Sequence, residues 1–444
     1  MDRRDFLKRS GAAAMALSAA ACAPKKGSQD EDCRCGDGRM PMRECGDDMV
    51  SLLGYGCMRW KMINGPDGQK IVDQDSVNEL VDYAIEHGVN YFDSSPMYLQ
   101  GQSEAATAKA LLRHPREDYY IATKMSNFGD HSYEGSVAMY RHSLEVYQTD
   151  HIDYYLLHSI GGMDAFKSRF QNNGVIDFLM AEREAGRIRH LGFSFHGNQK
   201  GFDELVALHD MYHWDFVQIQ MNYVDWNHAN QRNTNASHMY EELAKRDIPM
   251  VMMEPLLGGQ LARLSDSITA RLKEQEPQMS VASWAFRYCG TFPKVLTILS
   301  GMTYMEHLTD NVKTFENFKP LNEKELEMLE TLAGIIRSYP LVPCTACQYC
   351  MPCPYGIDIP GIFKHYNDHV NDESIPQGAE QKDFKKLKRR YLTSYDRAIE
   401  SIRQADHCIE CGQCAPHCPQ SINIPKELQR IDRYVEKLKR GTLD

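Results

Sequence analysis

Four side chains that could together reduce a carbonyl group occur in chain order, at Asp93, Tyr98, Lys124 and His158. Reduction needs a proton donor at the carbonyl oxygen, and a phenol can supply that proton when a neighbouring ammonium favours the phenolate. Lys124 would do this for Tyr98, and Asp93 would hold the ammonium by a charge-assisted hydrogen bond. His158 would donate to the carbonyl oxygen. Taken singly they could be a capping aspartate, a surface tyrosine and a core histidine. Their shared position, at or just past the ends of short apolar runs, favours a site.

A second chemical signal lies near the C-terminus, where eight of the 14 cysteines stand in two runs. The later run, CIECGQCAPHCP, resembles the bacterial ferredoxin pattern, in which closely spaced thiolates hold a 4Fe-4S cluster. The earlier run, CTACQYCMPCP, is one residue short before its fourth cysteine. Zinc is the alternative occupant of CxxC pairs. We predict two 4Fe-4S clusters, with ligands Cys344, Cys347, Cys350, Cys353, Cys408, Cys411, Cys414 and Cys418.

In two-cluster ferredoxins, the fourth cysteine of each run serves the other cluster. That resemblance pairs the first three cysteines of the earlier run with Cys418, and the first three of the later run with Cys353. Cys33, Cys35 and Cys45 follow no ligand pattern.

The elements that must position these residues follow from the chain after Met40, where apolar runs alternate with amphipathic ones. The apolar runs predict strands at 51–55, 91–93, 119–124, 152–158, 188–194, 216–220, 250–253 and 295–299. Apolar residues at three- and four-residue intervals predict helices, for example at 76–86, 137–147, 175–184, 237–245 and 281–288. This alternation predicts an α/β fold, a (β/α)8 TIM barrel. A doubly wound open sheet is the alternative, but barrels assemble their active sites at strand ends.

Seven stretches resemble the aldo-keto reductase family in their residues and in their order along the chain, over about residues 40 to 335. They are FDSSPMYLQGQSE, IATKM, DYYLLHS, LGFSFHG, IQMNY, EPLLGGQL and LSGMTYMEHLTDNV. The resemblance implies the catalytic roles given above and a nicotinamide site that uses no GxGxxG loop. The cofactor-binding positions that it implies are Gly56, Met58, Ser194, Gln218, Leu256, Gly258, Gly301, Met302, Thr303, His307 and Asn311.

Two departures from the family bear on the cofactor. Family members often place an aromatic residue where Met253 stands, to stack on the nicotinamide. They often place basic residues where Thr303 and Tyr304 stand, to bind the 2'-phosphate of NADP. Neither residue carries a positive charge, so NADP and NAD both stay open, with Arg263 as a candidate replacement cation.

Chain length and net charge limit the number of domains and the kind of partner that the molecule can have. A chain of 444 residues suggests two domains and an extension. We expect a signal and polar tether at 1–39, a barrel at 40–321 and a mainly helical ferredoxin-like iron-sulfur domain at 322–444. The net charge of -11 argues against a nucleic-acid partner. The basic run KKLKRR at 385–390 could dock an acidic redox protein or form a solvated helix face.

The N-terminus resembles a twin-arginine export signal. Arg3 and Arg4 precede an apolar run at 11–21 that is too short to span a bilayer. Cys22 follows small residues and precedes a polar stretch, which suits attachment of a lipid. We therefore expect a periplasmic or membrane-anchored lipoprotein, or a cytoplasmic protein if the leader does not function.

Together these features predict an NAD(P)-dependent oxidoreductase of the aldo-keto reductase type. It would interconvert an alcohol and the carbonyl group of a small aldehyde, ketone or sugar. The iron-sulfur domain would transfer electrons or be structural. The alternatives are a barrel that binds a nicotinamide without turnover, and an iron-sulfur electron carrier docked on a barrel. All four candidate catalytic residues are present, which favours the enzyme.

Overall fold

The computed structural model describes residues 38–229 and 233–443. The predicted export signal and Cys22 lie outside these residues. Contacts divide the described chain into two compact units, and the first takes residues 38–227, Thr234–Pro255 and Ser283–Leu329. The second takes mainly Leu256–Ala282 and the chain from Glu330 onward. The boundary after Leu329 lies inside helix α14 (Glu323–Ser338), whereas the sequence predicted a division before residue 322.

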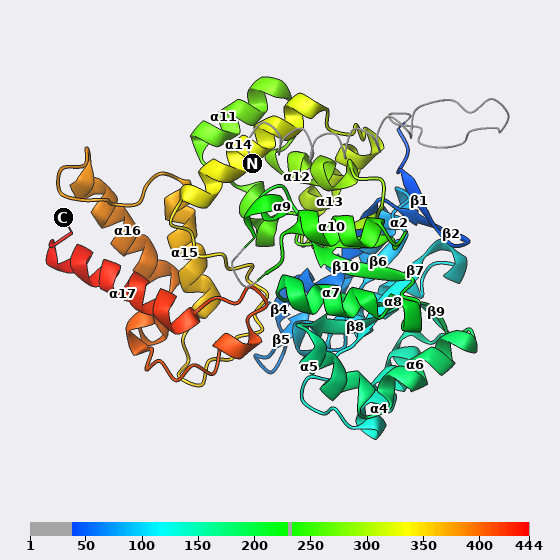
Figure 1. The fold of residues 1–444 in the computed structure, drawn as a ribbon. Helices are drawn as coiled ribbons and strands as arrows, with labels where there is room; N and C mark the ends of the chain where they lie inside the picture. Colours follow the sequence, from blue (N-terminus) through cyan, green and yellow to red (C-terminus); the bar gives the residue numbers. More distant parts are fainter. Residues whose placement is uncertain (1–37, 230–232, 444) are drawn as a thin grey trace. The chain divides into compact units, whose positions relative to one another are not determined.

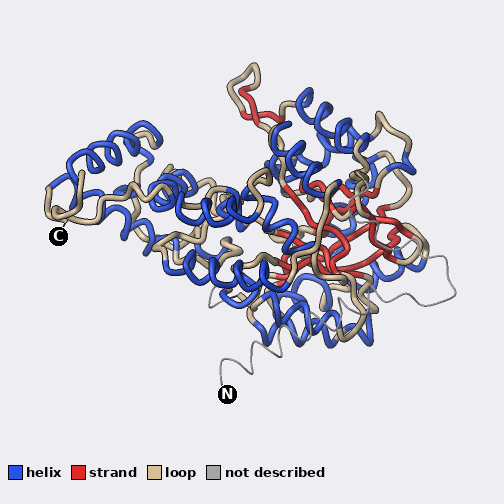
Figure 2. The backbone as a smooth tube through the Cα atoms, turned by 90° about the horizontal axis from the view of Figure 1, so that it is seen from above, coloured by secondary structure: helices blue, strands red, loops and turns tan. Residues whose placement is uncertain are grey.

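Eight parallel strands close into a barrel in the first unit (Figures 1 and 2). They pair in chain order, and the last strand pairs with the first. The predicted (β/α)8 barrel is confirmed, and each predicted strand is present to within about two residues at its ends. The strands are β3 (Leu53–Gly56), β6 (Tyr91–Asp93), β7 (Tyr120–Met125), β8 (Ile152–Ile160), β9 (Ile188–Phe195), β10 (Phe216–Gln220), β11 (Met250–Met253) and β12 (Val295–Ser300).

These segments form strands because their side chains can be buried on both faces of the sheet. In β8, which reads IDYYLLHSI, every side chain except that of Ser159 is buried. Such near-continuous apolar runs suit parallel strands, which helices cover from outside. Helices follow the strands around the barrel, among them α2 (Gln74–Glu86), α3 (Ser103–Leu111), α4 (Tyr133–Tyr147), α6 (Val175–Glu184), α7 (Gln199–Ala207), α10 (Ala236–Ala244), α12 (Val281–Gly290) and α13 (Met305–Glu316).

Side-chain caps fix where several of these helices begin. Asp73 accepts a hydrogen bond from the Ser76 amide at the start of α2, and Ser132 accepts one from the Gly135 amide at the start of α4. Each cap satisfies a backbone donor that the first helical turn leaves unpaired. The caps therefore help set the length of the loop before each helix, where the barrel presents its site residues.

Two antiparallel hairpins were not predicted. One pairs β1 (Met42–Cys45) with β2 (Asp48–Ser51), and the other pairs β4 (Met62–Asn64) with β5 (Lys70–Val72). Cys45 and Val50 of the first hairpin join an apolar cluster with Tyr91, Tyr154 and Phe216, which stand near the starts of barrel strands. The first hairpin therefore closes the N-terminal end of the barrel.

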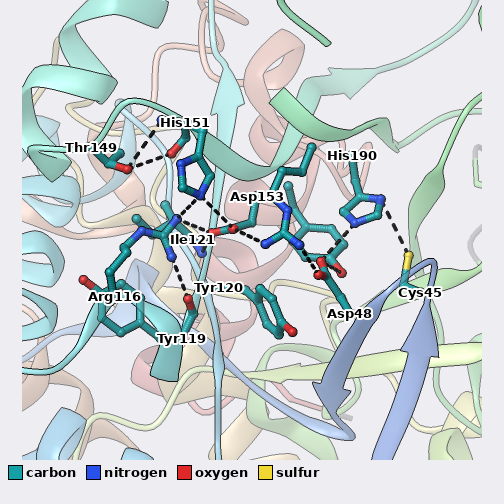
Figure 3. A network of polar contacts seen from close by, with 12 residues as sticks. Cys45, Asp48, Arg116, Tyr119, Tyr120, Ile121, Thr149, His151, Asp153 and His190 are labelled. Carbon is teal, nitrogen blue, oxygen red and sulfur yellow. Dashed lines mark hydrogen bonds and ion pairs between the residues drawn. The ribbon is translucent and has the colours of Figure 1, made fainter. Parts of the chain in front are cut away.

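A polar network holds this closed end together (Figure 3). Asp48, only 2% exposed, accepts hydrogen bonds from the Tyr154 hydroxyl at 3.1 Å and from Arg189 Nη2 at 2.5 Å. Asp153 accepts from Arg116 Nη2 at 2.6 Å and from Arg189 Nη1 at 3.1 Å. Each buried carboxylate thus has cationic partners, and losing one of them would leave a buried negative charge less well balanced, which is destabilising. This end of a TIM barrel serves stability, because active sites lie at the other end.

His190 makes the stability of this end depend on pH. Burial disfavours its imidazolium, but the hydrogen bond to Asp48 and the neighbouring Cys45 raise the pKa of His190 to about 9 from its ordinary 6.5. A raised pKa stabilises the folded state fully below the unfolded value, and that stabilisation is lost as pH rises through about 9. We therefore expect the free energy of unfolding to fall by about 3 kcal/mol through this residue as the pH rises from 6.5 to 9.

Urea unfolding of the barrel at the two pH values measures this effect. The control is His190→Gln, which keeps a donor for Asp48 and cannot titrate. It should lose most of the difference between the two pH values. An equal pH dependence in the variant would contradict the assignment.

The second unit is built from helices and long loops, as predicted for the iron-sulfur domain. Its helices are α11 (Asp266–Gln275), α15 (Ile359–Asn371), α16 (Phe384–Ala398) and α17 (Ile424–Arg440). Phe363 of α15, Tyr391 and Tyr395 of α16 and Ile431 of α17 share its apolar core. The two cysteine runs lie in loops that pack against this core. No helix in the described part of the chain is both long and apolar enough to cross a membrane.

Candidate functional site

The four candidate catalytic residues meet at the C-terminal ends of neighbouring strands. Asp93 ends β6, Lys124 lies near the end of β7 and His158 lies near the end of β8, and these strands are adjacent in the barrel. Tyr98 begins the short helical turn η2 (Tyr98–Gly101) after β6. All four are buried, with Lys124 only 1% exposed. The structure therefore places them where barrels build active sites.

Lys124 is held by two acceptors and faces the phenol. Its Nζ donates to Asp93 Oδ1 at 2.5 Å and to the carbonyl of Ser94 at 2.7 Å. Nζ lies 4.9 Å from the centroid of the Tyr98 ring. Burial raises the pKa of Asp93, and the charge and hydrogen bond of Lys124 oppose that rise. The ammonium is thus placed to stabilise a phenolate at Tyr98.

His158 lies against the same phenol, and its surroundings favour the neutral imidazole. Its ring meets that of Tyr98 edge-on, with 5.8 Å between the centroids. Burial, with the charges of Lys124, Arg169 and His196, lowers the pKa of His158 well below 6.5. Arg169 donates to the carbonyl of His158 at 2.8 Å. A neutral imidazole can donate one hydrogen bond to a carbonyl oxygen without giving up its proton.

Ser126, which was not predicted, contacts one ring nitrogen of His158. Ser126 Oγ lies 2.6 Å from His158 Nδ1 and 2.8 Å from Ser95 Oγ, and Ser95 Oγ accepts from the Met97 amide at 3.2 Å. We assign donation from Ser95 to Ser126 and from Ser126 to Nδ1. This order leaves the hydrogen on Nε2, the tautomer needed to donate to a substrate.

We expect Ser126→Ala to lower kcat by about tenfold, because Nδ1 loses its donor and the other tautomer becomes populated. Steady-state kinetics measure the loss, which should fall on kcat more than on KM. Ser126→Thr retains the hydroxyl and should recover most of the activity. Equal kcat values for the alanine variant and the native protein would show that Ser126 does not position His158.

Gly56 and Gly301 allow two loops beside the site to approach each other closely, because neither carries a side chain. A Cβ on Gly56 would lie 3.4 Å from the Ser300 carbonyl, and one on Gly301 would lie 2.8 Å from Arg59 Cδ. Met58 lies in the turn η1 (Cys57–Arg59) after Gly56. The structure therefore brings the loops after β3 and β12 together, as a dinucleotide held by both would require.

The helix α13 begins directly after the Gly301 loop. Met302 and Thr303 lie in that loop, and His307 and Asn311 lie on the helix. Asn311 Nδ2 donates to Ser300 Oγ at 2.9 Å, which ties the helix to the end of β12. The N-terminus of a helix favours anions such as a pyrophosphate.

Gln218 offers an unused acceptor deep in the barrel. It lies beside Ser194 on the neighbouring strand and is 3% exposed. In the part of the chain that the structure describes, its Oε1 is buried and has no hydrogen-bond partner. A buried carbonyl oxygen without a partner is costly, so it suits an amide donor from a ligand. The carboxamide of a nicotinamide is such a donor.

Leu256 and Gly258 belong to the second unit by their contacts. Gly258 has a positive φ of 68°, and a Cβ there would lie 2.2 Å from Thr345 Cα. Gln260 Nε2 donates to the carbonyl of Cys344 at 3.1 Å. The loop that continues from β11 therefore packs against the segment with the first cysteine run.

Arg263 has a partner in this unit that the sequence did not reveal. Its guanidinium binds both carboxylate oxygens of Asp372, at 2.8 and 2.9 Å. The candidate replacement cation for a 2'-phosphate is thus already paired with an acidic residue.

The eight cysteines form two groups in the second unit. Burial, then the neighbouring Cys347, Cys344 and Cys418 thiols, raise the pKa of Cys350 to about 12. Burial and thiols that include Cys353 and Cys411 likewise raise the pKa values of Cys408 and Cys414. These neighbours are the two sets that the ferredoxin pattern predicts.

A set of four thiols in loops suits a 4Fe-4S cluster, because the cluster replaces each proton with iron and removes the mutual repulsion of the thiolates. Among residues 38–229 and 233–443, no three His, Cys, Asp or Glu side chains converge to hold a single metal ion. The clusters are therefore indicated by the cysteine spacing and the grouping of the thiols, and not by a preformed ligand geometry.

Sequence comparison identifies both parts of the chain. The profile of the aldo/keto reductase family matches residues 52–333, and that of the 4Fe-4S dicluster domain matches residues 343–424. The uncharacterized oxidoreductase YqkF of Bacillus subtilis is 24% identical over 306 residues, 64% of this chain and 92% of that protein. L-galactose dehydrogenase of Arabidopsis thaliana is 23% identical over 308 residues, 64% of this chain and 89% of that protein.

Solved structures share the barrel fold. The holo form of an aldo-keto reductase from Bacillus halodurans has a TM-score of 0.53 at 23% identity. The match covers 66% of this chain and 96% of the Bacillus chain. An aldo/keto reductase from Klebsiella pneumoniae in complex with NADP and acetate has a TM-score of 0.52 at 20% identity. The match covers 66% of this chain and 95% of the Klebsiella chain.

Proposed function

The chain belongs to the aldo/keto reductase family, and from that premise we propose that it reduces the carbonyl group of a small aldehyde, ketone or sugar with a bound nicotinamide. It is an oxidoreductase with an iron-sulfur domain. The observation that carries the proposal is the buried pair of Lys124 and Asp93, set beside Tyr98 and a neutral His158. A barrel that only bound a nicotinamide would not need this costly arrangement of buried charges.

Each residue has one task in the reaction. The nicotinamide, when bound, supplies a hydride to the carbonyl carbon. His158 Nε2 donates a hydrogen bond to the carbonyl oxygen and sets its direction, and the Tyr98 hydroxyl gives that oxygen its proton. Lys124 stabilises the phenolate that is left, and Asp93 balances the ammonium. Burial strengthens each of these interactions, because water does not screen them.

The residues that would hold the dinucleotide fit it at both ends. Ser194 and Gln218 would bind the carboxamide, using the unpaired Gln218 oxygen. Gly56 and Gly301 would let the pyrophosphate approach the backbone, and Arg59, whose stem lies at Gly301, would supply a cation. We propose NADP or NAD as the cofactor, and the NADP complex of the Klebsiella protein supports NADP.

Steady-state oxidation of NADPH and NADH against a panel of aldehydes, ketones and sugars tests this function. We expect substrate-dependent oxidation that requires Tyr98. A protein that binds dinucleotide tightly but turns over no member of the panel would favour the non-catalytic alternative.

We also propose that the chain is exported in folded form through its twin-arginine leader and keeps its dinucleotide bound. Clusters and dinucleotide are available in the cytoplasm, and no pool of free NAD(P)H is expected outside it. Protein purified from the membrane fraction should therefore retain about one dinucleotide per chain after extensive dialysis. Cofactor-free protein recovered from the cytoplasm would contradict both parts of this proposal.

A further inference from the structure

Three exposed apolar side chains gather around the second group of cysteines. They are Tyr355, Ile402 and Ile409, which are 47%, 70% and 60% exposed. No other large apolar side chain in the described part of the second unit is exposed. Exposed apolar residues scattered singly need no explanation, but a cluster marks an interaction site.

Hydrogen bonds bring the segments that carry these residues together, and we call the three side chains the apolar patch (Tyr355, Ile402 and Ile409). Arg403 Nε donates to the carbonyl of Gly356 at 3.2 Å, and the Asp358 amide donates to the carbonyl of Arg403 at 3.1 Å. The segment with Ile402 therefore lies along the segment with Tyr355. Ile409 directly follows Cys408, and the Cys408 thiol lies close to that of Cys353.

One cysteine of this group reaches the surface. Cys411 is exposed, whereas the other seven candidate ligands are only partly exposed. A cluster bound there would have one edge at the surface, beside the apolar patch. A purely structural cluster needs no such opening, but transfer of an electron to another protein does. The interfaces of transient redox encounters are small, usually below about 1,200 Å², which suits a patch of three side chains.

The neighbouring helix α16 indicates the charge of the partner. Arg389, Arg390 and Arg397 line one hollow of ≈ 860 Å³ together with Lys385 and Lys386. Within the described residues, only Arg390 of these five forms an ion pair, at 3.8 Å from Asp372. Unpaired cations on one helix face attract an acidic surface and speed its association.

The basic face and the apolar patch belong to one packed structure. The Ala405 amide donates to the Tyr395 hydroxyl of α16 at 3.3 Å, and Gln404 Nε2 donates to Asp396 Oδ1 at 3.2 Å. The end of α16 is thereby fixed to the segment that joins Ile402 to Cys408. Figure 1 shows α16 in orange beside α17 in the same unit.

We propose that the apolar patch and the basic face of α16 dock a small acidic one-electron carrier protein of the flavodoxin or ferredoxin class. The reduced carrier loses one electron, and the 4Fe-4S cluster held by Cys353, Cys408, Cys411 and Cys414 gains it. This inference deepens the proposed function, on whose cluster assignment it rests, by giving the enzyme a redox partner.

The test uses the full-length protein with its clusters and measures binding of a purified acidic flavodoxin and an acidic 2Fe-2S ferredoxin by biolayer interferometry. Ile402→Asp combined with Ile409→Asp should weaken binding by roughly tenfold or more, because charged side chains replace the centre of the contact. Arg389→Glu combined with Arg390→Glu should slow association and flatten its salt dependence. Met211→Asp is the matched control, since Met211 is 62% exposed on the barrel unit, and it should change binding less than about twofold.

Iron content and circular dichroism establish that each variant is folded, and stopped-flow mixing with reduced carrier gives the rate of electron transfer. Equal affinities for the native protein and both double variants would overturn the proposal. So would binding to neither carrier, or binding to anionic phosphatidylglycerol vesicles in their place. None of these measurements needs a carbonyl substrate, so carrier binding without carbonyl reduction would sink only the proposed barrel reaction.

Discussion

Tyr98→Phe is expected to lower turnover by roughly 10²- to 10⁴-fold, because the variant lacks the group that gives the carbonyl oxygen its proton. The aromatic ring that packs against His158 and faces Lys124 remains. Dinucleotide affinity should therefore change little. Steady-state kinetics and fluorescence titration with NADPH measure the two quantities separately.

Tyr133→Phe is a matched control for this substitution, because it removes a hydroxyl from a tyrosine that is 42% exposed on α4. It should retain native activity. If the Tyr98 variant were as active as this control, the proton would have to come from elsewhere, and the assignment of all four residues would fail.

The protein as purified without oxygen should contain roughly eight irons per chain and absorb visible light as a brown solution. Cys411→Ser should lose about half of that iron, because it removes one ligand of the second group while the first group stays intact. Iron analysis and the visible spectrum check this result. The loss of iron and of stability should exceed any loss of barrel chemistry, since the nicotinamide takes up two electrons as a hydride and a cluster passes one.

Gln413→Ser, an exposed change in the same loop, should keep the native iron content. Protein without iron, or with zinc in its place, would exclude 4Fe-4S clusters at these cysteines.

The barrel could be predicted because its strands are short, apolar and separated by amphipathic helices. β8 is buried along nearly its whole length, so its sequence shows a nearly continuous apolar run and no alternation of polar and apolar residues. Asp93, Lys124 and His158 could be found because they interrupt such runs at their ends. Helix α3 is not among the helices given above as examples; its sequence, SEAATAKAL, is buried on most sides and shows no single apolar stripe.

The parts that the sequence could not provide depend on contacts between distant residues. Ser126 looks like any serine near a strand end until the fold brings it to His158. The ion pairs of Asp48 and Asp153 come from four separate segments, and the hairpin β1–β2 is too short for a periodic pattern. Arg263 was considered as a phosphate ligand because its partner Asp372 lies far along the chain.

The contact between Gly258 and Thr345 also orders events during synthesis. The loop that follows β11 is synthesised before β12, α13 and α14. It can pack fully only after the segment that begins at Cys344 has also been made. A nascent chain can therefore hold all eight barrel strands while this loop still lacks its packing partner.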